Sequence, residues 1–327
     1  MWVIVVKYYK LSYNLLMLEF RNVTKYYHSY RAVEYLNHKF TSNRIAVYGV
    51  EGSGKSTVLR LVSGVEKCTE GEILLFNKQV EISKDVFFTF RDGGLLKNKT
   101  VRENLLFPLK IRDVKNAENI VNSSIEEFDL QEIKDCKLSH ISFSERARII
   151  LAKLKLRKTK MMLIDNPFEN LDTEQRAEYF NWFLDIIKDY KGIVIYATDN
   201  KQEIESFNEV ILLNYGFVKG YGNINDVFTN PYNIFIYSFY EQLKLFNGMI
   251  FKEENTLYFT DKVDKIKIND AVSARIIPEF IPMECILAIK PSSVEKLGKT
   301  VEELKLLDLE DSTDIWLFDW NENSIIK

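Results

Sequence analysis

The chain alternates between short apolar runs and longer segments in which apolar residues have a helical spacing. Short apolar runs bounded by turn residues are typical of buried strands. Such runs predict strands at 18–23, 31–36, 44–47, 71–76, 85–90, 161–165, 192–197, 209–213 and 217–220. Apolar residues that recur every three or four positions predict helices at 55–62, 101–112 and 116–129, and a further amphipathic helix that ends at Lys158. This alternation indicates an α/β domain.

The pattern changes near Asn230 and Pro231. Residues 232–246 have a helical spacing, whereas period-2 runs dominate at 249–252, 256–259, 285–289 and 315–318. Period-2 alternation is typical of strands with one buried face, so the tail is expected to form a small β-barrel or sandwich of the oligonucleotide/oligosaccharide-binding kind. We therefore expect an N-terminal extension at 1–16, a larger domain at 17–230 and a β-rich regulatory domain at 231–327.

The first 16 residues are interpreted separately. Lys7 and Lys10 interrupt the apolar pattern there, so it falls short of the roughly 20 apolar residues of a membrane span. The order of charge, apolar core and small-residue cleavage site expected of a signal peptide is not found. Because Leu18 and Phe20 begin the first strand pattern, Met17 is the more natural start. Residues 1–16 are interpreted as an upstream extension or a start-site error.

Composition narrows the classes of function. The 327 residues are 46% hydrophobic and suffice for about two domains with full cores. A formal charge of -3 offers no basic field for nucleic acid, so no such partner is expected. The cysteines Cys68, Cys136 and Cys285 are too scattered for a metal cluster, and their odd number argues against a disulfide framework. A reducing cytoplasm fits this usage.

The most specific motif lies between the strand at 44–47 and the helix at 55–62. It fits the phosphate-binding pattern G-x-x-x-x-G-K-[ST] and consists of Gly49, Val50, Glu51, Gly52, Ser53, Gly54, Lys55, Ser56 and Thr57. In this context backbone N–H groups close around a phosphate, and the helix N-terminus adds partial positive charge. Lys55 would reach the β- and γ-phosphates, and the Ser56 hydroxyl would ligate Mg²⁺. The alternative is a chance glycine-rich turn that binds no ligand. Such a turn would not need every position of the motif together with a strand before it and a helix after it.

A carboxylate suited to the same metal ends the apolar strand at 161–165. Asp165 stands in the order expected for the aspartate that supports Mg²⁺ in P-loop NTPases. The alternative is an aspartate that merely ends a core strand. The sequence therefore predicts a nucleotide site in the domain at 17–230, with ATP and Mg²⁺ as cofactors.

Several further segments resemble the ATP-binding subunits of ABC transporters. Tyr27 stands at the spacing at which this family places an aromatic residue that stacks on adenine, and residues 100–105 are very similar to the segment that opens the family's helical subdomain. The signature segment corresponds to Ile141, Ser142, Phe143, Ser144 and Glu145, and the D-loop to Asn170, Leu171 and Asp172. The resemblance covers residues 17–228. It implies an α/β P-loop NTPase fold of ABC type, with an antiparallel β-subdomain and a helical subdomain.

The tail adds a more diffuse resemblance. Residues 226–236 resemble the domain junction in the ATPases of maltose-type carbohydrate importers, and residues 286–291 are similar to a later segment of those proteins. This resemblance implies import of a carbohydrate or a related solute.

Four elements depart from the family pattern. Arg91 stands where the family has a glutamine that connects the nucleotide site to the membrane subunits. Phe143 and Ser144 replace the signature glycines, and their Cβ atoms restrict both conformation and approach. Asn166 replaces a glutamate that acts as general base or orients water, and an amide cannot take a proton near neutral pH. Asp199 replaces a histidine that contacts the γ-phosphate, which adds negative charge beside a polyanion.

These observations favour an ATP-binding subunit of an ABC transporter with impaired hydrolysis. The resemblance implies integral membrane permease subunits as partners, a homodimer or a heterodimer with a paralogous ATPase, and a cytoplasmic location on the inner face of the membrane. The alternative is a non-catalytic scaffold or regulatory subunit paired with an intact paralogue. Asp199 as a substitute base stays open. A small-molecule P-loop kinase is disfavoured, since it needs neither Tyr27 nor a β-rich tail.

Overall fold

The computed structural model describes residues 18–83, 85–90, 93–157, 159–229, 234–237, 239, 244–254, 256–260, 265–267, 283–289 and 315–319. The predicted extension at 1–16 and the predicted switch residue Arg91 lie outside these ranges. The chain divides into two compact units, one that ends at Gly222 and one that begins at Asn223. Among the described helices, none has the length and apolar character that crossing a bilayer requires.

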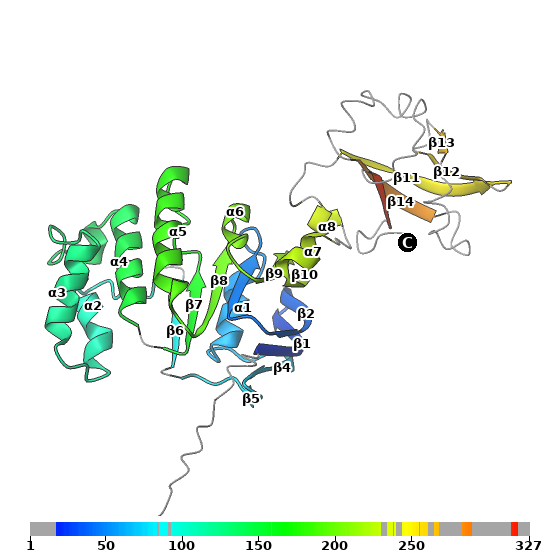
Figure 1. Ribbon diagram of the computed structural model, residues 1–327. Coiled ribbons are helices and arrows are strands. Elements are labelled where there is room, and N and C mark those ends of the chain that lie inside the picture. Colours follow the sequence, from blue (N-terminus) through cyan, green and yellow to red (C-terminus); the bar gives the residue numbers. More distant parts are fainter. Residues whose placement is uncertain are drawn as a thin grey trace, which may run out of the picture. The chain divides into compact units, whose positions relative to one another are not determined.

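The first unit is built on a ten-stranded sheet with the order β5-β4-β1-β2-β10-β9-β3-β8-β7-β6 (Figure 1). The strands are β1 Leu18–Tyr27, β2 Tyr30–Phe40, β3 Arg44–Tyr48, β4 Glu70–Leu75, β5 Lys78–Gln79, β6 Val86–Phe88, β7 Met161–Asp165, β8 Ile193–Thr198, β9 Glu209–Asn214 and β10 Phe217–Asn223. The helices are α1 Lys55–Val62, α2 Val101–Lys110, α3 Ala117–Glu127, the 3-10 helix η1 Leu138–His140, α4 Phe143–Lys155, α5 Thr173–Lys188 and α6 Lys201–Ile204.

The strands that carry the site are parallel and buried. β3 pairs in parallel with β9 on one side and β8 on the other, and β8 pairs with β7. All residues of β7 and β8 are buried, as expected for strands covered on both faces. The carboxyl ends of parallel strands meet at one edge of a sheet, which is where ligands of such sheets bind. The register sets Tyr48 beside Thr198 and Asp165 beside Ala197 at that edge.

The other part of the sheet is antiparallel. β1 pairs with β2 and with β4, and its inward side chains pack in the core shared with α1. Phe20 and Phe40, both fully buried, make an edge-to-face contact with ring centroids 5.8 Å apart. Aromatic pairs in this geometry stabilise a core beyond the area that they bury. The antiparallel part of the sheet also reaches the phosphate-binding loop, since the Ala32 carbonyl of β2 lies against Gly54.

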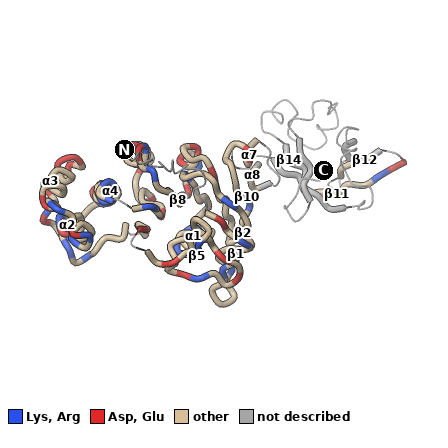
Figure 2. Tube along the Cα trace, turned by 60° about the horizontal axis from the view of Figure 1, so that its bottom comes forward, with Lys and Arg blue, Asp and Glu red and all other residues tan. Residues whose placement is uncertain are grey.

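Helices α2 and α3 form a separate subdomain beyond α4 (Figure 1). A capping box starts α2, in which Thr100 and Glu103 satisfy each other's backbone N–H groups. The buried Asn104 accepts from the Leu96 N–H at 2.7 Å and donates to the Thr100 carbonyl at 2.9 Å, which fixes the loop before the helix. Lys and Arg are interspersed with Asp and Glu over these helices (Figure 2), and Arg102 pairs with Glu118 at 3.6 Å.

The second unit contains a five-stranded antiparallel sheet with the order β13-β12-β11-β14-β15. Its elements are α7 Ile224–Thr229, α8 Ile234–Tyr237, β11 Lys244–Glu253, β12 Thr256–Thr260, β13 Lys265–Lys267, β14 Met283–Ile289 and β15 Ile315–Asp319. The period-2 runs of the tail thus coincide with strands. The predicted helix at 232–246 is wrong in its last part, because Lys244 already begins β11. Pairing of residues 244–246 with β14 outweighs the local helical spacing.

A chain that ends at Asn230 should stay folded and should still bind ATP, because the ten-stranded sheet is complete before that residue. Circular dichroism melting and isothermal titration would measure both properties, with the full chain as control. Aggregation of the shortened chain would mean that the tail completes the core of the first unit.

Candidate nucleotide-binding site

The phosphate-binding loop is clamped between β2 and β9. A Cβ atom at Gly49 would lie 2.6 Å from the Leu213 carbonyl oxygen, and a Cβ at Gly54 would overlap the Ala32 carbonyl. Gly54 also has φ of 106°, a left-handed conformation that side chains rarely adopt. Both positions therefore require glycine. They let the loop turn tightly enough for its N–H groups to surround one small volume.

That volume is a cavity of about 210 Å³. It is lined by Tyr30, Glu51, Gly52, Ser53, Gly54, Lys55, Ser56, Thr57, Asp165 and Asn166. The Lys55 ammonium is folded back under the loop, where it donates to the Gly49 carbonyl at 2.5 Å and the Val50 carbonyl at 2.9 Å. The buried Ser53 hydroxyl has no protein partner within the described chain. The loop has no room for a Cβ atom at Gly49 or Gly54, and the buried Ser53 hydroxyl lacks a hydrogen-bond partner among the described residues. Both features fit a phosphate ligand.

Asp165 lines the same cavity as the loop. It ends β7, is 3% exposed, and its N–H donates to the Thr89 hydroxyl at 3.0 Å. Ser56 lines the same cavity. A carboxylate and a hydroxyl are the oxygen ligands that Mg²⁺ accepts, so the pair predicted from the sequence shares one site and fits the metal.

Asn166 follows Asp165 and is also buried. Its backbone has φ of 41°, and its N–H donates to the Ala197 carbonyl at 2.9 Å. Its side-chain oxygen faces Arg176 Nη2 at 3.2 Å, and its amide hydrogen-bonds to Asp199. Both ends of the side chain are therefore engaged by protein groups. It has no carboxylate that would accept a proton from water.

Arg176, from the first turns of α5, joins the ends of β7 and β8. Its Nε donates to Glu203 at 2.7 Å, and its Nη2 forms an ion pair with Asp199 at 2.8 Å. The same Nη2, which carries two hydrogens, also faces Thr198 Oγ1 at 3.0 Å, Asn166 Oδ1 at 3.2 Å and Glu203 Oε2 at 3.2 Å. Glu203 is 3% exposed and also accepts from Tyr196 at 3.1 Å. We call Asn166, Arg176, Asp199 and Glu203 the arginine cluster.

The Asp199 carboxyl is a weaker base than an ordinary aspartate. Burial opposes its ionisation, but the hydrogen bond and the charge of Arg176 outweigh burial and hold its pKa below the ordinary value. The Asn166 hydrogen bond and the charge of Lys55 act in the same direction. Arg176 is therefore the cation that offsets the negative charge of Asp199. Nothing in the local sequence connects residue 176 to residue 199, so sequence reasoning did not find it.

Two tyrosines lie near the loop. The predicted adenine-stacking residue Tyr27 ends β1, hydrogen-bonds to Glu66 and carries the Lys25 ammonium 5.0 Å from its ring centre. Burial and the Glu66 hydrogen bond raise the pKa of its hydroxyl. Tyr30, which the sequence reasoning passed over, lines the cavity, and its hydroxyl donates to the Gly52 carbonyl at 2.7 Å. The stacking role of Tyr27 stays a prediction.

The signature segment is placed outside the cavity of its own chain. Ser142 is the N-cap of α4 and forms a capping box with Glu145, and Ser144 hydrogen-bonds to Tyr179 of α5 at 2.6 Å. Phe143 is 54% exposed, and Ile141 is buried. In the D-loop, Asp172 caps α5 by accepting from the Gln175 N–H at 2.9 Å, with Asn170 and Leu171 before it. Both segments therefore have local structural roles in this chain.

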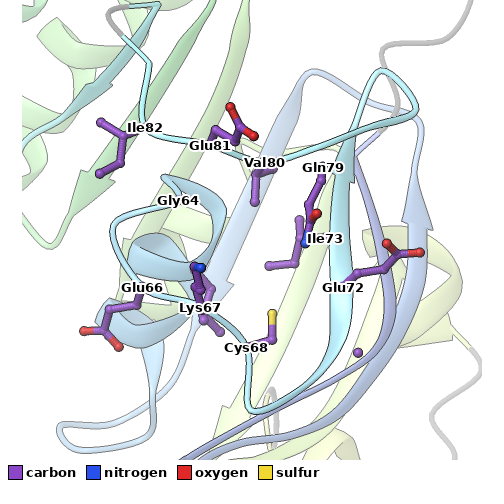
Figure 3. A pocket seen from close by; sticks show the side chains of 12 residues that line it. Gly64, Glu66, Lys67, Cys68, Glu72, Ile73, Gln79, Val80, Glu81 and Ile82 are labelled. Carbon is purple, nitrogen blue, oxygen red and sulfur yellow. The ribbon is translucent and has the colours of Figure 1, made fainter.

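A second cavity of about 560 Å³ lies between the C-terminal end of α1, β4 and the segment after β5 (Figure 3). Its charged lining consists of Glu66, Lys67, Glu72 and Glu81. Cys68 and Ile73 also face it (Figure 3). Carboxylates prevail in this lining, and none of its residues belongs to the phosphate-binding loop.

Comparison with known proteins agrees with the geometry. The family model described as ABC transporter matches residues 38–169. The chain is 29% identical over 242 residues to the sulfate/thiosulfate import ATP-binding protein CysA of Thermosynechococcus vestitus, which covers 71% of each chain. It is 27% identical over 249 residues to the Fe(3+) ions import ATP-binding protein FbpC of Escherichia coli, covering 74% of this chain and 72% of that one.

The solved structures agree in fold. A dimeric ATP-binding cassette in a post-hydrolysis state with ADP and Pi superposes with a TM-score of 0.56 and 20% identity, covering 64% of this chain and 99% of that chain. The sheet and the glycine cradle define the first unit as a P-loop NTPase domain. The match of the ABC transporter family model to residues 38–169 agrees with this, and the unit has the fold of an ABC-type ATP-binding domain. The predicted fold class is thus confirmed.

Tyr27→Ala should weaken ATP binding by about 1–3 kcal/mol, the range for a base stacked on an aromatic ring. Isothermal titration measures the loss, and Tyr30→Phe, which removes only the hydroxyl that contacts Gly52, serves as the control. Unchanged affinity in Tyr27→Ala with a loss in Tyr30→Ala would assign the stacking to Tyr30 instead.

Asp199→Asn should lower the free energy of unfolding at pH 7 by roughly 1 kcal/mol, since a charge-assisted hydrogen bond is lost at a side chain that is one-third exposed. The folded-state pKa of Asp199 is depressed, so its contribution is present above the unfolded pKa and disappears as pH falls through the folded value. The difference between parent and variant should therefore shrink below about pH 4. Urea unfolding at several pH values measures it, and a difference that persists at the lowest pH would contradict the ion-pair assignment.

Proposed function

We propose that this protein is the ATP-binding subunit of an ABC importer and that its own hydrolysis of ATP is impaired. The proposal rests chiefly on the residues that line one cavity. The phosphate-binding loop and Asp165 are complete there, but Asn166 stands where hydrolysis would need a carboxylate. Lys55 and the loop N–H groups would hold the phosphates, and Ser56 and Asp165 would hold Mg²⁺, which stabilises charge on the phosphate oxygens when bound.

The arginine cluster supports the impaired hydrolysis. Asn166 cannot remove a proton from water, and its side chain is held by Arg176 and Asp199. Asp199 is the alternative base, but its ion pair with Arg176 reduces its basicity. Loss of general-base catalysis alone costs about 10²–10⁴-fold in rate. The exposed Phe143 in the signature segment would further hinder close approach to a nucleotide bound by a second subunit.

Import is proposed from the printed names of CysA and FbpC, which specify sulfate or thiosulfate and Fe(3+) ions. These names do not support the carbohydrate suggested by the tail, and they differ too much to fix one solute. Membrane permease subunits and a second ATPase subunit are the proposed partners. The proposed location is the cytoplasmic face of the membrane. A non-catalytic subunit beside an intact paralogue is the second candidate, favoured by the same Asn166 observation.

The purified protein should bind Mg-ATP, Lys55→Ala should weaken binding clearly, and phosphate release should stay near background. Isothermal titration and a phosphate-release assay measure these properties on the same preparation. Asn166→Glu should restore little turnover, because the new carboxylate would enter a cluster in which Asp199 and Glu203 already share the guanidinium of Arg176.

Failure to bind Mg-ATP would contradict the nucleotide site itself. Robust Mg²⁺-dependent turnover that Lys55→Ala abolishes would show an alternative catalytic arrangement and would contradict only the impaired hydrolysis. Asp199→Asn separates the alternatives further, since a loss of that turnover would identify Asp199 as a substitute base.

A further inference from the structure

The half-buried side chain of Arg157 lacks a hydrogen-bond acceptor. Arg157 follows the last turn of α4, and its guanidinium carbon lies 4.5 Å from the ring centre of Phe87 in the edge strand β6. Its Nε is buried, and the residues that the structure describes offer this atom no acceptor. A buried N–H group without an acceptor costs free energy, so a ligand that accepts hydrogen bonds would stabilise this position.

Two other half-buried arginines of the same unit do have acceptors. Arg44 donates to four backbone carbonyls at 2.6 or 3.0 Å. Arg176 forms ion pairs with Asp199 and Glu203. The Arg157 side chain forms neither kind of contact within the described part of the chain, where its one close neighbour of this type is the Phe87 ring. The ring fixes the guanidinium in place but accepts only weakly from it.

The surroundings of Arg157 also oppose its positive charge. Its pKa is lowered to about 10, chiefly because burial removes water from the charged guanidinium and further because the like charge of Arg112 acts on it. Arg112 follows α2, so this second positive charge comes from a different part of the unit. The carboxylate nearest in sequence to Phe87 is that of Asp85, which is paired with Lys160 at 2.8 Å. A negative charge beside Arg157 would therefore offset an unfavourable one that the protein carries.

We propose that Arg157 binds a small tetrahedral oxyanion, phosphate or sulfate, with the Phe87 ring as its platform and Arg112 as a second source of positive charge. A guanidinium presents parallel N–H donors that match two oxygens of one oxyanion. None of the three residues lines the nucleotide cavity, so the inference does not require that the protein bind a nucleotide. Because Arg112 follows α2 and Phe87 belongs to the sheet, a bound oxyanion would link the helical subdomain to the edge of the sheet.

The test is isothermal titration of the full chain with inorganic phosphate at constant ionic strength, with Mg-ADP in excess to occupy the phosphate-binding loop. Any phosphate that the loop still binds is common to the parent and its variants. Arg157→Gln should weaken the binding at least about tenfold, because charge-assisted hydrogen bonds are lost. Arg148→Gln is the matched control on the same helix, where Arg148 already pairs with Asp129 at 2.8 Å, and should change the affinity less than about twofold. Sulfate should compete with phosphate.

No phosphate binding by the parent, equal affinity in Arg157→Gln, or an equal loss in Arg148→Gln would each overturn the inference. If Arg157→Gln does not fold, Arg157→Met supplies the second measurement, since it keeps an unbranched apolar side chain next to Phe87. Exchange of chloride for sulfate at equal ionic strength should raise the urea midpoint of the parent more than that of Arg157→Met. The general stabilising effect of sulfate acts on both chains and cancels in this comparison. An equal rise in both would contradict a bound oxyanion at Arg157.

Discussion

The close approach of the phosphate-binding loop to its neighbouring strands is the constraint on which the site depends. At Gly49 the backbone passes so near the Leu213 carbonyl, and at Gly54 so near the Ala32 carbonyl, that a single added carbon atom does not fit. This contact joins β3, the antiparallel strands and β9 into one rigid support. The support aims the loop N–H groups into a small cavity and lets Lys55 fold beneath them. A loop held less tightly would not present converging donors to a phosphate.

The arginine cluster adjoins the cavity through Asn166, the one cluster member among the residues that line it. Asn166 and Asp199 are both hydrogen-bonded to Arg176, so one guanidinium holds both side chains. The buried Glu203 keeps that guanidinium in place. The loop and the cluster are built from different elements: the loop joins β3 to α1, whereas the cluster gathers side chains from α5, α6 and the segments that follow β7 and β8.

Much of the fold was predictable because its signals are local. Apolar runs predicted the parallel strands β3, β7 and β8, and the glycine spacing predicted the loop between β3 and α1. The tail shows the limit of such signals. Residues 244–246 have a helical spacing in the sequence but belong to β11, because pairing with β14 decides their conformation. The helix α5 was not predicted, although it carries Arg176.

The sequence by itself determined which residues are candidates for the site: it predicted a phosphate loop with Lys55, Asp165 as a metal ligand, and Asn166 and Asp199 beside them. Only the tertiary structure decided how those groups are balanced. The cation that faces Asp199 comes from α5, and the buried carboxylate that anchors this cation comes from α6. Periodicity and spacing encode conformation over a few residues. An ion pair depends instead on which strand ends and helices are brought together, and that follows from the order of the strands in the sheet.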